Sequence, residues 1–251
     1  MSIRRTRLLL AAQKTYAEDE TAFLVVTTED DTTYQVYIRD ANTTRINVID
    51  WGDGTKEAVS TGTTAFKAFQ HIYSTPNEYE VRIKGLCYGI DLTNYGNTYG
   101  KLVKEWFHAS LGLTAMQDWA SFASIRAIGS KFALPPNLQT MVSFAREGTL
   151  PSGAYTKLQI PDTVTNLDGA FSNIGGGDFD ITNLFDKWTT KSLSRNLRIA
   201  FSRYSRNYIV GTAPTLWEQG FTFSNTTNAF GACTRLTNYN DIPASWGGGG
   251  A

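Results

Sequence analysis

Short stretches in the first third of the chain alternate apolar and polar positions. Residues 23–26 form an apolar run, and residues 34–39, 46–51 and 79–84 change character at every second position. Period two is typical of a half-buried β-strand, because successive side chains point to opposite faces of a sheet. These stretches therefore predict β-strands, with the charged positions of 79–84 directed outward.

A tight turn is predicted at Trp51-Gly52-Asp53-Gly54, between two of these strands. Glycine accepts a positive φ without a Cβ penalty, and an aspartate side chain can accept a hydrogen bond from the backbone two residues on. Aromatic and apolar positions follow the turn at wider spacing. They are His71, Tyr73, Tyr79 and Val81.

This order of elements resembles the immunoglobulin-like PKD domain over roughly residues 21–85. The resemblance implies an immunoglobulin-like β-sandwich in which the Gly52-Asp53-Gly54 turn joins two strands. It also implies that the strands bearing His71 pack in the core, so that His71 is structural rather than catalytic. Trp51 stands where that family usually has phenylalanine.

From residue 86 onward a phenylalanine next to a small residue recurs. The copies are Phe122, Phe144, Phe171, Phe201 and Phe230. Successive residue numbers differ by 22, 27, 30 and 29, which is a period typical of solenoid repeats. Residues 229–246 resemble a BspA-type leucine-rich repeat, with weaker copies at 134–138 and 158–161. Such repeats bury their apolar edges only by stacking on one another.

The expected fold class is therefore mainly β: a PKD-like sandwich followed by a short, irregular leucine-rich-repeat solenoid. We expect four segments. They are an N-terminal arm at 1–20, the sandwich at 21–85, the solenoid at 86–246 and a flexible glycine-rich tail at 247–251.

Composition agrees with a β-rich chain. Of 251 residues, 13% are aromatic, 18% are charged and 22 are glycine. Lys plus Arg and Asp plus Glu both number 23, so no overall field would attract nucleic acid or an anionic membrane. The apolar run 8–12 is shorter than the core of a signal peptide, and no run is long enough to span a bilayer. We expect synthesis in a cytoplasm, with neither a membrane nor nucleic acid as partner.

Few residues suggest catalysis. Cys87 and Cys233 lack the spacing of a zinc site or a disulfide framework. His108 could partner Cys87 in a cysteine hydrolase, but no cysteine-centred motif surrounds either residue. We therefore expect no enzyme, and keep the hydrolase as an alternative.

Metal and phosphate sites are also weakly indicated. Asp40, Asp50 and Asp53 could hold calcium, but they fit no twelve-residue calcium loop, and the turn explains Asp53. Residues 96–101 suggest a phosphate-binding loop, yet their glycine spacing is one residue short and Leu102 replaces the hydroxyl that would hold magnesium. We expect no cofactor.

One stretch between Asp186 and Glu218 is basic, with tyrosines between the cations. The candidate binding patch comprises Lys187, Lys191, Arg195, Arg198, Arg203, Tyr204, Arg206 and Tyr208. Such residues can hold phosphate groups or anionic glycans. Since the whole chain is neutral, we favour a solvated face complementary to an acidic neighbouring subunit.

Both resemblances imply a contact protein. Similar pairings occur in tailed-phage virion proteins and in bacterial surface proteins. We expect a non-enzymatic bacteriophage virion structural protein of the tail, baseplate or capsid surface, assembled in the host cytoplasm with other virion proteins and copies of itself. The alternative is an adhesin or receptor-binding module at a bacterial or phage surface that recognises a host glycan or protein.

Overall fold

The computed structural model describes residues 15–40, 46–85, 88–92, 102–121, 123–130, 132–151, 153–154, 158–203 and 208–250. The prediction of a mainly β chain is confirmed, because these residues form strands and turns and contain no α-helix. Two short 3-10 turns lie near the C-terminal end, η3 (Tyr239–Asp241) and η4 (Ala244–Trp246).

The larger sheet has six strands in the order β10-β8-β1-β6-β3-β4. Its strands are β1 (Glu20–Val26), β3 (Asn47–Asp50), β4 (Lys56–Val59), β6 (Glu78–Lys84), β8 (Val103–His108) and β10 (Ala127–Ile128). All neighbours pair antiparallel except β10 and β8, which are parallel. In β6 the predicted alternation is confirmed, with Tyr79, Val81 and Ile83 buried.

The second sheet has the order β5-β2-β7-β9. Its strands are β2 (Thr33–Asp40), β5 (Thr63–Ile72), β7 (Gly89–Asp91) and β9 (Ala115–Gln117). β2 pairs antiparallel with β5 and β7, whereas β7 and β9 are parallel. Tyr34, Val36 and Ile38 of β2 are fully buried, which agrees with their period of two.

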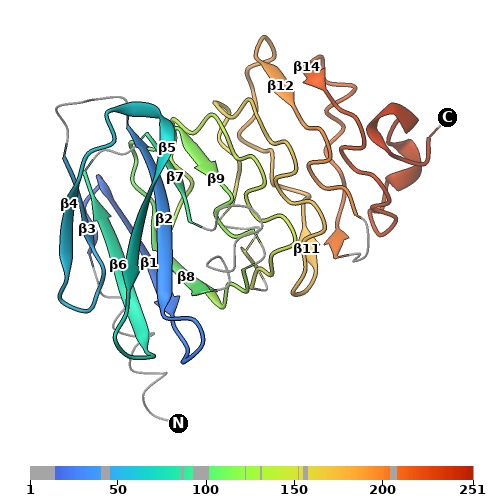
Figure 1. Cartoon of the computed structure of the whole chain (residues 1–251). Coiled ribbons are helices and arrows are strands. Elements are labelled where there is room, and N and C mark those ends of the chain that lie inside the picture. The colour runs from blue at the N-terminus through green and yellow to red at the C-terminus, as the bar shows by residue number, and fades with distance from the viewer. Residues whose placement is uncertain are drawn as a thin grey trace.

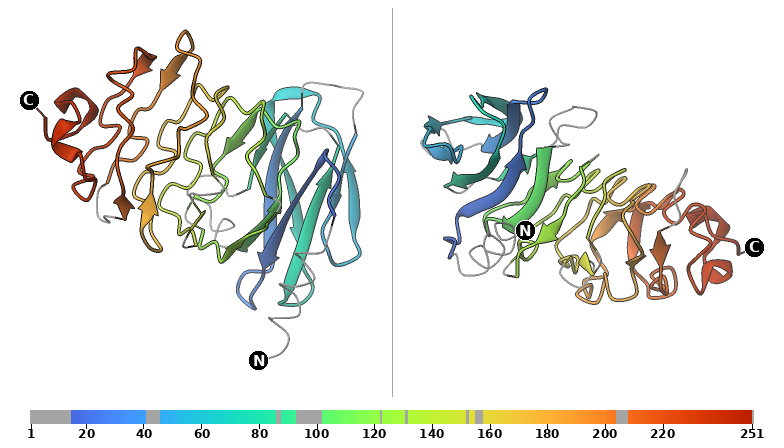
Figure 2. Two further views of the ribbon diagram at one scale, coloured as in Figure 1. Left: turned by 180° about the vertical axis from the view of Figure 1, so that it is seen from behind. Right: turned by 90° about the horizontal axis from the view of Figure 1, so that it is seen from below.

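From β9 onward the chain winds into successive turns, which we call the coil stack (residues 115–246; Figure 1). Parallel bridges join residues 25 to 30 positions apart, as in Ala115 to Thr140, Thr140 to Asn166 and Asn166 to Asn196. The stack also contains two parallel strand pairs. They are β11 (Phe179–Asp180) with β13 (Ile209–Val210), and β12 (Ser194–Asn196) with β14 (Thr222–Asn225). Figure 2 shows this stack extending from one end of the two sheets.

A column of aromatic rings runs through the stack. Ring centroids lie 5.8 Å apart for Phe144 and Phe171, 5.5 Å for Phe171 and Phe201, and 5.3 Å for Phe201 and Phe230. All four rings are completely buried. Each ring therefore stabilises two coils at once, through apolar burial and ring contacts.

The two sheets and the stack share one hydrophobic core. Trp106 of β8 contacts Phe144, with centroids 5.5 Å apart, and so connects the larger sheet to the aromatic column. Strands on both sides of the expected boundary at residue 85 pair with each other, because β8 pairs with β1 and β7 pairs with β2. Of the expected arm, residues 1–14 lie outside the described residues, and Glu20 already belongs to β1.

The glycine-rich end is not the flexible tail expected from the sequence. The Gly249 amide donates to the carbonyl of Tyr239, and the Gly250 amide donates to that of Ile242, both at 3.0 Å. A Cβ on Gly248 would lie 2.2 Å from the Ile242 carbonyl oxygen, so this close packing requires glycine. Together with Trp246, which stacks on Phe230, the glycines close the stack.

Candidate functional site

Arg195 lies at the centre of the predicted basic patch, yet its side chain is completely buried. It belongs to β12 and points into the molecule. The guanidinium carbon lies 4.3 Å from the centroid of the Trp188 ring and 5.2 Å from that of Phe221. These distances are typical of cation–π contacts, which strengthen when the cation is removed from water.

Hydrogen bonds fix the same guanidinium. Nη1 donates to the Thr190 carbonyl at 2.7 Å, and Nη2 donates to the Asp162 carbonyl at 3.1 Å and to Asp162 Oδ1 at 2.8 Å. The placement of Arg195 in an exposed binding patch is therefore wrong. A fully buried cation with an internal carboxylate partner cannot also serve an external ligand.

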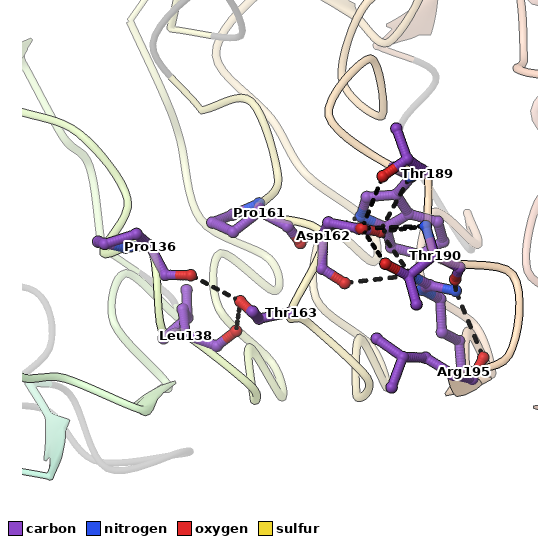
Figure 3. Close-up of polar contacts among 10 residues, drawn as sticks. Pro136, Leu138, Pro161, Asp162, Thr163, Thr189, Thr190 and Arg195 are labelled. Carbon is purple, nitrogen blue, oxygen red and sulfur yellow. Dashed lines mark hydrogen bonds and ion pairs between the residues drawn. The ribbon is translucent and has the colours of Figure 1, made fainter.

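Asp162 is the acceptor at the centre of this arrangement (Figure 3). Its carboxylate receives hydrogen bonds from the backbone amides and the hydroxyls of Thr189 and Thr190. Burial by itself would raise the pKa of Asp162, but the hydrogen bonds from Thr190 and Thr189 outweigh it and lower the pKa below its ordinary value. The carboxylate is therefore held in its charged form.

Neighbouring groups extend this network over three coils. The Trp188 indole donates to the Pro161 carbonyl at 3.2 Å. On the other side, the Thr163 hydroxyl lies 2.8 Å from the Pro136 carbonyl and 2.7 Å from that of Leu138 (Figure 3). We call the group of Asp162, Thr189, Thr190 and Arg195 the coil-linking node. Its hydrogen bonds connect separate turns of the chain.

The other described members of the predicted patch are exposed or half-buried. Lys187 and Lys191 are exposed, whereas Tyr208 is half-buried. Arg198 is 49% exposed and pairs with Asp168, with Nη2 2.8 Å from Oδ2. Arg203 is half-buried, and its Nε atom is inaccessible to solvent.

Two further patch residues, Tyr204 and Arg206, lie outside the described residues. Phe201, which interrupts the basic run in the sequence, belongs to the buried aromatic column. In the described part of the patch the two lysines are exposed, Arg198 is paired with Asp168, and the one cation that stacks on rings, Arg195, is buried.

The residues of the turn motif, by contrast, lie together at the two sheets. His71 stacks on Trp51 with centroids 5.1 Å apart, and its Nε2 lies 2.8 Å from Asp53 Oδ2. Tyr73 donates its hydroxyl hydrogen to the Trp51 carbonyl at 3.0 Å and stacks on Tyr79 at 4.0 Å. The four rings thus hold the turn against β5 and β6.

Local geometry explains the glycine and the aspartate of this turn. Gly52 has a φ of +86°, and a Cβ there would lie 2.6 Å from the Glu80 carbonyl oxygen. Burial favours a raised pKa for Asp53, but hydrogen bonds from His71 and Thr55 lower it overall. The Asp53 carboxylate accepts the Thr55 amide at 2.9 Å, the two-residue aspartate turn expected from the sequence.

The remaining candidates for chemistry occupy separate places. His108 Nδ1 lies 2.6 Å from the Glu20 carbonyl oxygen, while Cys87 lies outside the described residues. Asp50 pairs with Lys56 at 3.2 Å, and Asp40 is buried at the end of β2. Within the residues that the structure describes, no three potential metal-ligating side chains come together.

The aromatic column also contains a position that the phenylalanine spacing missed. The Ala120 amide donates to the Phe144 carbonyl, and the Ala145 amide donates to that of Ala170, both at 2.7 Å. Ala120 and Ala145 therefore occupy equivalent positions in successive coils. The residues that precede them, Trp119 and Phe144, are equivalent for the same reason. Trp119 is fully buried, whereas Phe122, the predicted first anchor, lies outside the described residues.

An asparagine ladder accompanies the column. Asn166, Asn196 and Asn225 are bridged in parallel, and each side-chain oxygen accepts the amide two residues on. Asn196 Nδ2 also donates to Asn166 Oδ1 at 3.1 Å. Each asparagine precedes a column phenylalanine by five residues, a spacing that could have revealed the ladder in the sequence. Asp162 had no comparable local signal.

Comparison with known proteins gives no relative. No family model, no curated protein and no solved structure matches this chain. Among the described residues, no helix has the length and apolar character needed to cross a membrane.

Proposed function

We propose that this protein is a non-enzymatic structural component of a bacteriophage virion, in the tail, baseplate or capsid surface, that acts through protein–protein interfaces. We also propose that residues 21–85 form a PKD-like immunoglobulin-like sandwich and that residues 86–246 form a leucine-rich-repeat-like solenoid. The role is inferred from architecture and from the use of polar groups, and no known relative contributes to it.

The observation that carries the proposal is the internal use of the groups that could have performed chemistry. Arg195 and Asp162 bind each other and adjacent coils. His71 braces a turn through Asp53, and His108 faces a backbone carbonyl. These arrangements favour a rigid scaffold, because each polar group fixes one segment of the chain to another.

The shape supports the same proposal. The two sheets continue into the coil stack, and the shared hydrophobic core makes the molecule an elongated, rigid body (Figures 1 and 2). Rigid elongated bodies with large lateral faces suit repeated contacts in an assembly, where preorganised surfaces lose little conformational entropy on binding. The PKD-like part is further supported by the ring contacts that join Trp51, His71, Tyr73 and Tyr79 in series.

Particle association tests the proposal. Particles of the phage that encodes this chain are banded on a density gradient, and each band is quantified by mass spectrometry against the major capsid protein. We expect the chain to band with the particles at a constant ratio that survives a high-salt wash, while a soluble host enzyme serves as control. Recovery only in the soluble fractions would refute a virion role; glycan-array binding would then favour the adhesin alternative.

A further inference from the structure

The larger sheet carries an apolar patch on its outer face, the face turned away from the shared core. The patch consists of Ala22 and Leu24 of β1 and Phe107 of β8, which form a hydrophobic cluster of their own. All three side chains are buried. Since Phe23 and Val25 pack in the main core, β1 is buried on both faces, and its outer side chains are shielded by something other than that core.

Part of this cover is the segment just before β1, residues 15–19, which we call the strap. It packs against the patch through Tyr16, which is half-buried. The Tyr16 ring stacks on Phe107 with centroids 6.3 Å apart and on His108 with centroids 5.7 Å apart. The residues on either side of Tyr16 are exposed, so the ring provides the main contact between the strap and the patch.

Arg82 of β6 fixes the place where this ring lies. Its guanidinium carbon is 5.1 Å from the centroid of the Tyr16 ring, a distance typical of a cation–π contact. Arg82 Nη2 lies 2.6 Å from Glu80 Oε1, and Nη1 lies 3.4 Å from Glu20 Oε1. Because both carboxylates belong to the sheet, they hold the guanidinium independently of the strap. The Tyr16 hydroxyl lies 3.5 Å from Glu80 Oε1, at the outer limit of a hydrogen bond, and so adds little.

The backbone of the strap makes hydrogen bonds at exposed positions. The Ala17 amide donates to Glu20 Oε2 at 3.2 Å, and the Ala17 carbonyl accepts the Glu20 amide at 3.0 Å. The Leu111 amide donates to the Glu18 carbonyl at 2.8 Å. Ala17, Glu18 and Leu111 are exposed, so water competes for these bonds. Segments held by few buried contacts and by exposed hydrogen bonds open at a lower free energy than the core.

We propose that the strap opens while both sheets stay folded, and that its opening exposes the apolar patch at Phe107. β1 pairs with β6 on one side and with β8 on the other, so the sheet keeps its order when Tyr16 leaves. The strap is then a reversible cover over an apolar surface of the kind that favours association when it is exposed. This inference concerns the free chain and does not depend on the proposed virion role.

Hydrogen exchange of the full chain, followed residue by residue by NMR at increasing low concentrations of urea, tests independent opening. The Leu111 amide reports the strap, and the Val25 amide reports β1 within the sheet. After correction for intrinsic rates, Leu111 is expected to exchange roughly a hundredfold faster than Val25 or more. Its rate should not change with urea, because a local opening exposes little surface, whereas the rate of Val25 should rise.

Variants of Tyr16 test the role of the ring. Tyr16→Ala removes the ring contacts and should speed Leu111 exchange roughly tenfold. It should also raise the fluorescence of the apolar dye 8-anilinonaphthalene-1-sulfonate, because the patch is exposed more often. Tyr16→Phe keeps the ring and should match wild type in both measurements. Tyr37→Ala is the matched control, since Tyr37 is a half-buried tyrosine of the other sheet, and should leave Leu111 exchange unchanged.

Each measurement can contradict the proposal. If Leu111 and Val25 share one opening free energy and one urea dependence in wild type, the strap opens only when the sheet unfolds. This comparison needs no variant, so it stands even where Tyr16→Ala fails to fold. If folded Tyr16→Ala exchanges Leu111 at the wild-type rate, the ring does not hold the strap. Faster exchange without added dye fluorescence would overturn exposure of the patch.

Discussion

Replacing Asp162 with alanine removes the only carboxylate that contacts the buried Arg195 guanidinium in the described chain. The cation would remain beside Trp188 with carbonyl acceptors but no counter-charge. Breaking a buried ion pair from one side costs about 3 to 5 kcal/mol. The Asp162 side chain is 24% exposed, so partial solvent screening places the expected loss near the lower end, about 3 kcal/mol.

Urea unfolding followed by circular dichroism measures this loss as a shift of the midpoint. The single variants Asp162→Ala and Arg195→Met are compared with the double variant. Removing both charges leaves no buried cation, so the double variant should be more stable than Asp162→Ala alone, despite carrying two changes.

Asp168→Ala is the matched control, because its partner Arg198 is half exposed and such pairs contribute about 1 kcal/mol or less. A loss for Asp162→Ala no greater than that for Asp168→Ala, or a double variant that is the least stable of the set, would contradict a buried Arg195 charge that depends on Asp162.

Acid provides a second readout of the same carboxylate. The pKa of Asp162 is lowered in the folded chain, so its contribution to stability is present above the ordinary aspartate pKa of about 3.9 and is lost as the pH falls through the folded value. Asp162→Asn should therefore reduce the loss of unfolding free energy between about pH 5 and pH 2. An unchanged acid profile would contradict this assignment.

Three further outcomes are expected. Phe201→Ala should cost about 3 to 5 kcal/mol in urea unfolding, because its ring is fully buried between two others, and the half-buried Phe66→Ala should cost less than half as much. Gly248→Ala should lower the thermal midpoint through a clash with Ile242, while Ser245→Ala, at an exposed position, should change stability by about 0.5 kcal/mol or less. Burial raises the pKa of the Cys233 thiol to about 12. Iodoacetamide at neutral pH should therefore label Cys233 only after denaturation, which peptide mapping can show. Labelling of Cys233 in the folded chain would contradict this burial.

Local periodicity was sufficient to predict much of the strand content. Buried and less buried residues alternate along β2 and β6 because successive side chains face opposite sides of the sheet. The order of apolar and polar residues along each strand is therefore enough to predict this pattern. The turn at Gly52 was predictable for a similar reason, since its φ of +86° favours the residue type found there. The column rings at Phe144, Phe171, Phe201 and Phe230 followed from spacing along the chain.

Contacts between distant residues were not predictable in this way. Arg195 was placed on a surface because the run around it is basic, yet its burial depends on Asp162, which lies 33 residues earlier. The glycine run was expected to be flexible because polyglycine has no side chains to pack. Its order depends on carbonyl acceptors at Tyr239 and Ile242 and on space too narrow for a Cβ.

Because the sheets and the coil stack share one core, they are expected to open as one rigid body. Native-state hydrogen exchange tests this claim directly by comparing Val25 of β1 with Ala145 and Phe171, whose amides donate to the next coil at 2.7 Å. A shared core predicts that these amides exchange through openings whose free energies agree within roughly 1 kcal/mol. If the opening free energies of the coil amides are about 3 kcal/mol or more below that of the Val25 amide, the stack unfolds as a separate unit.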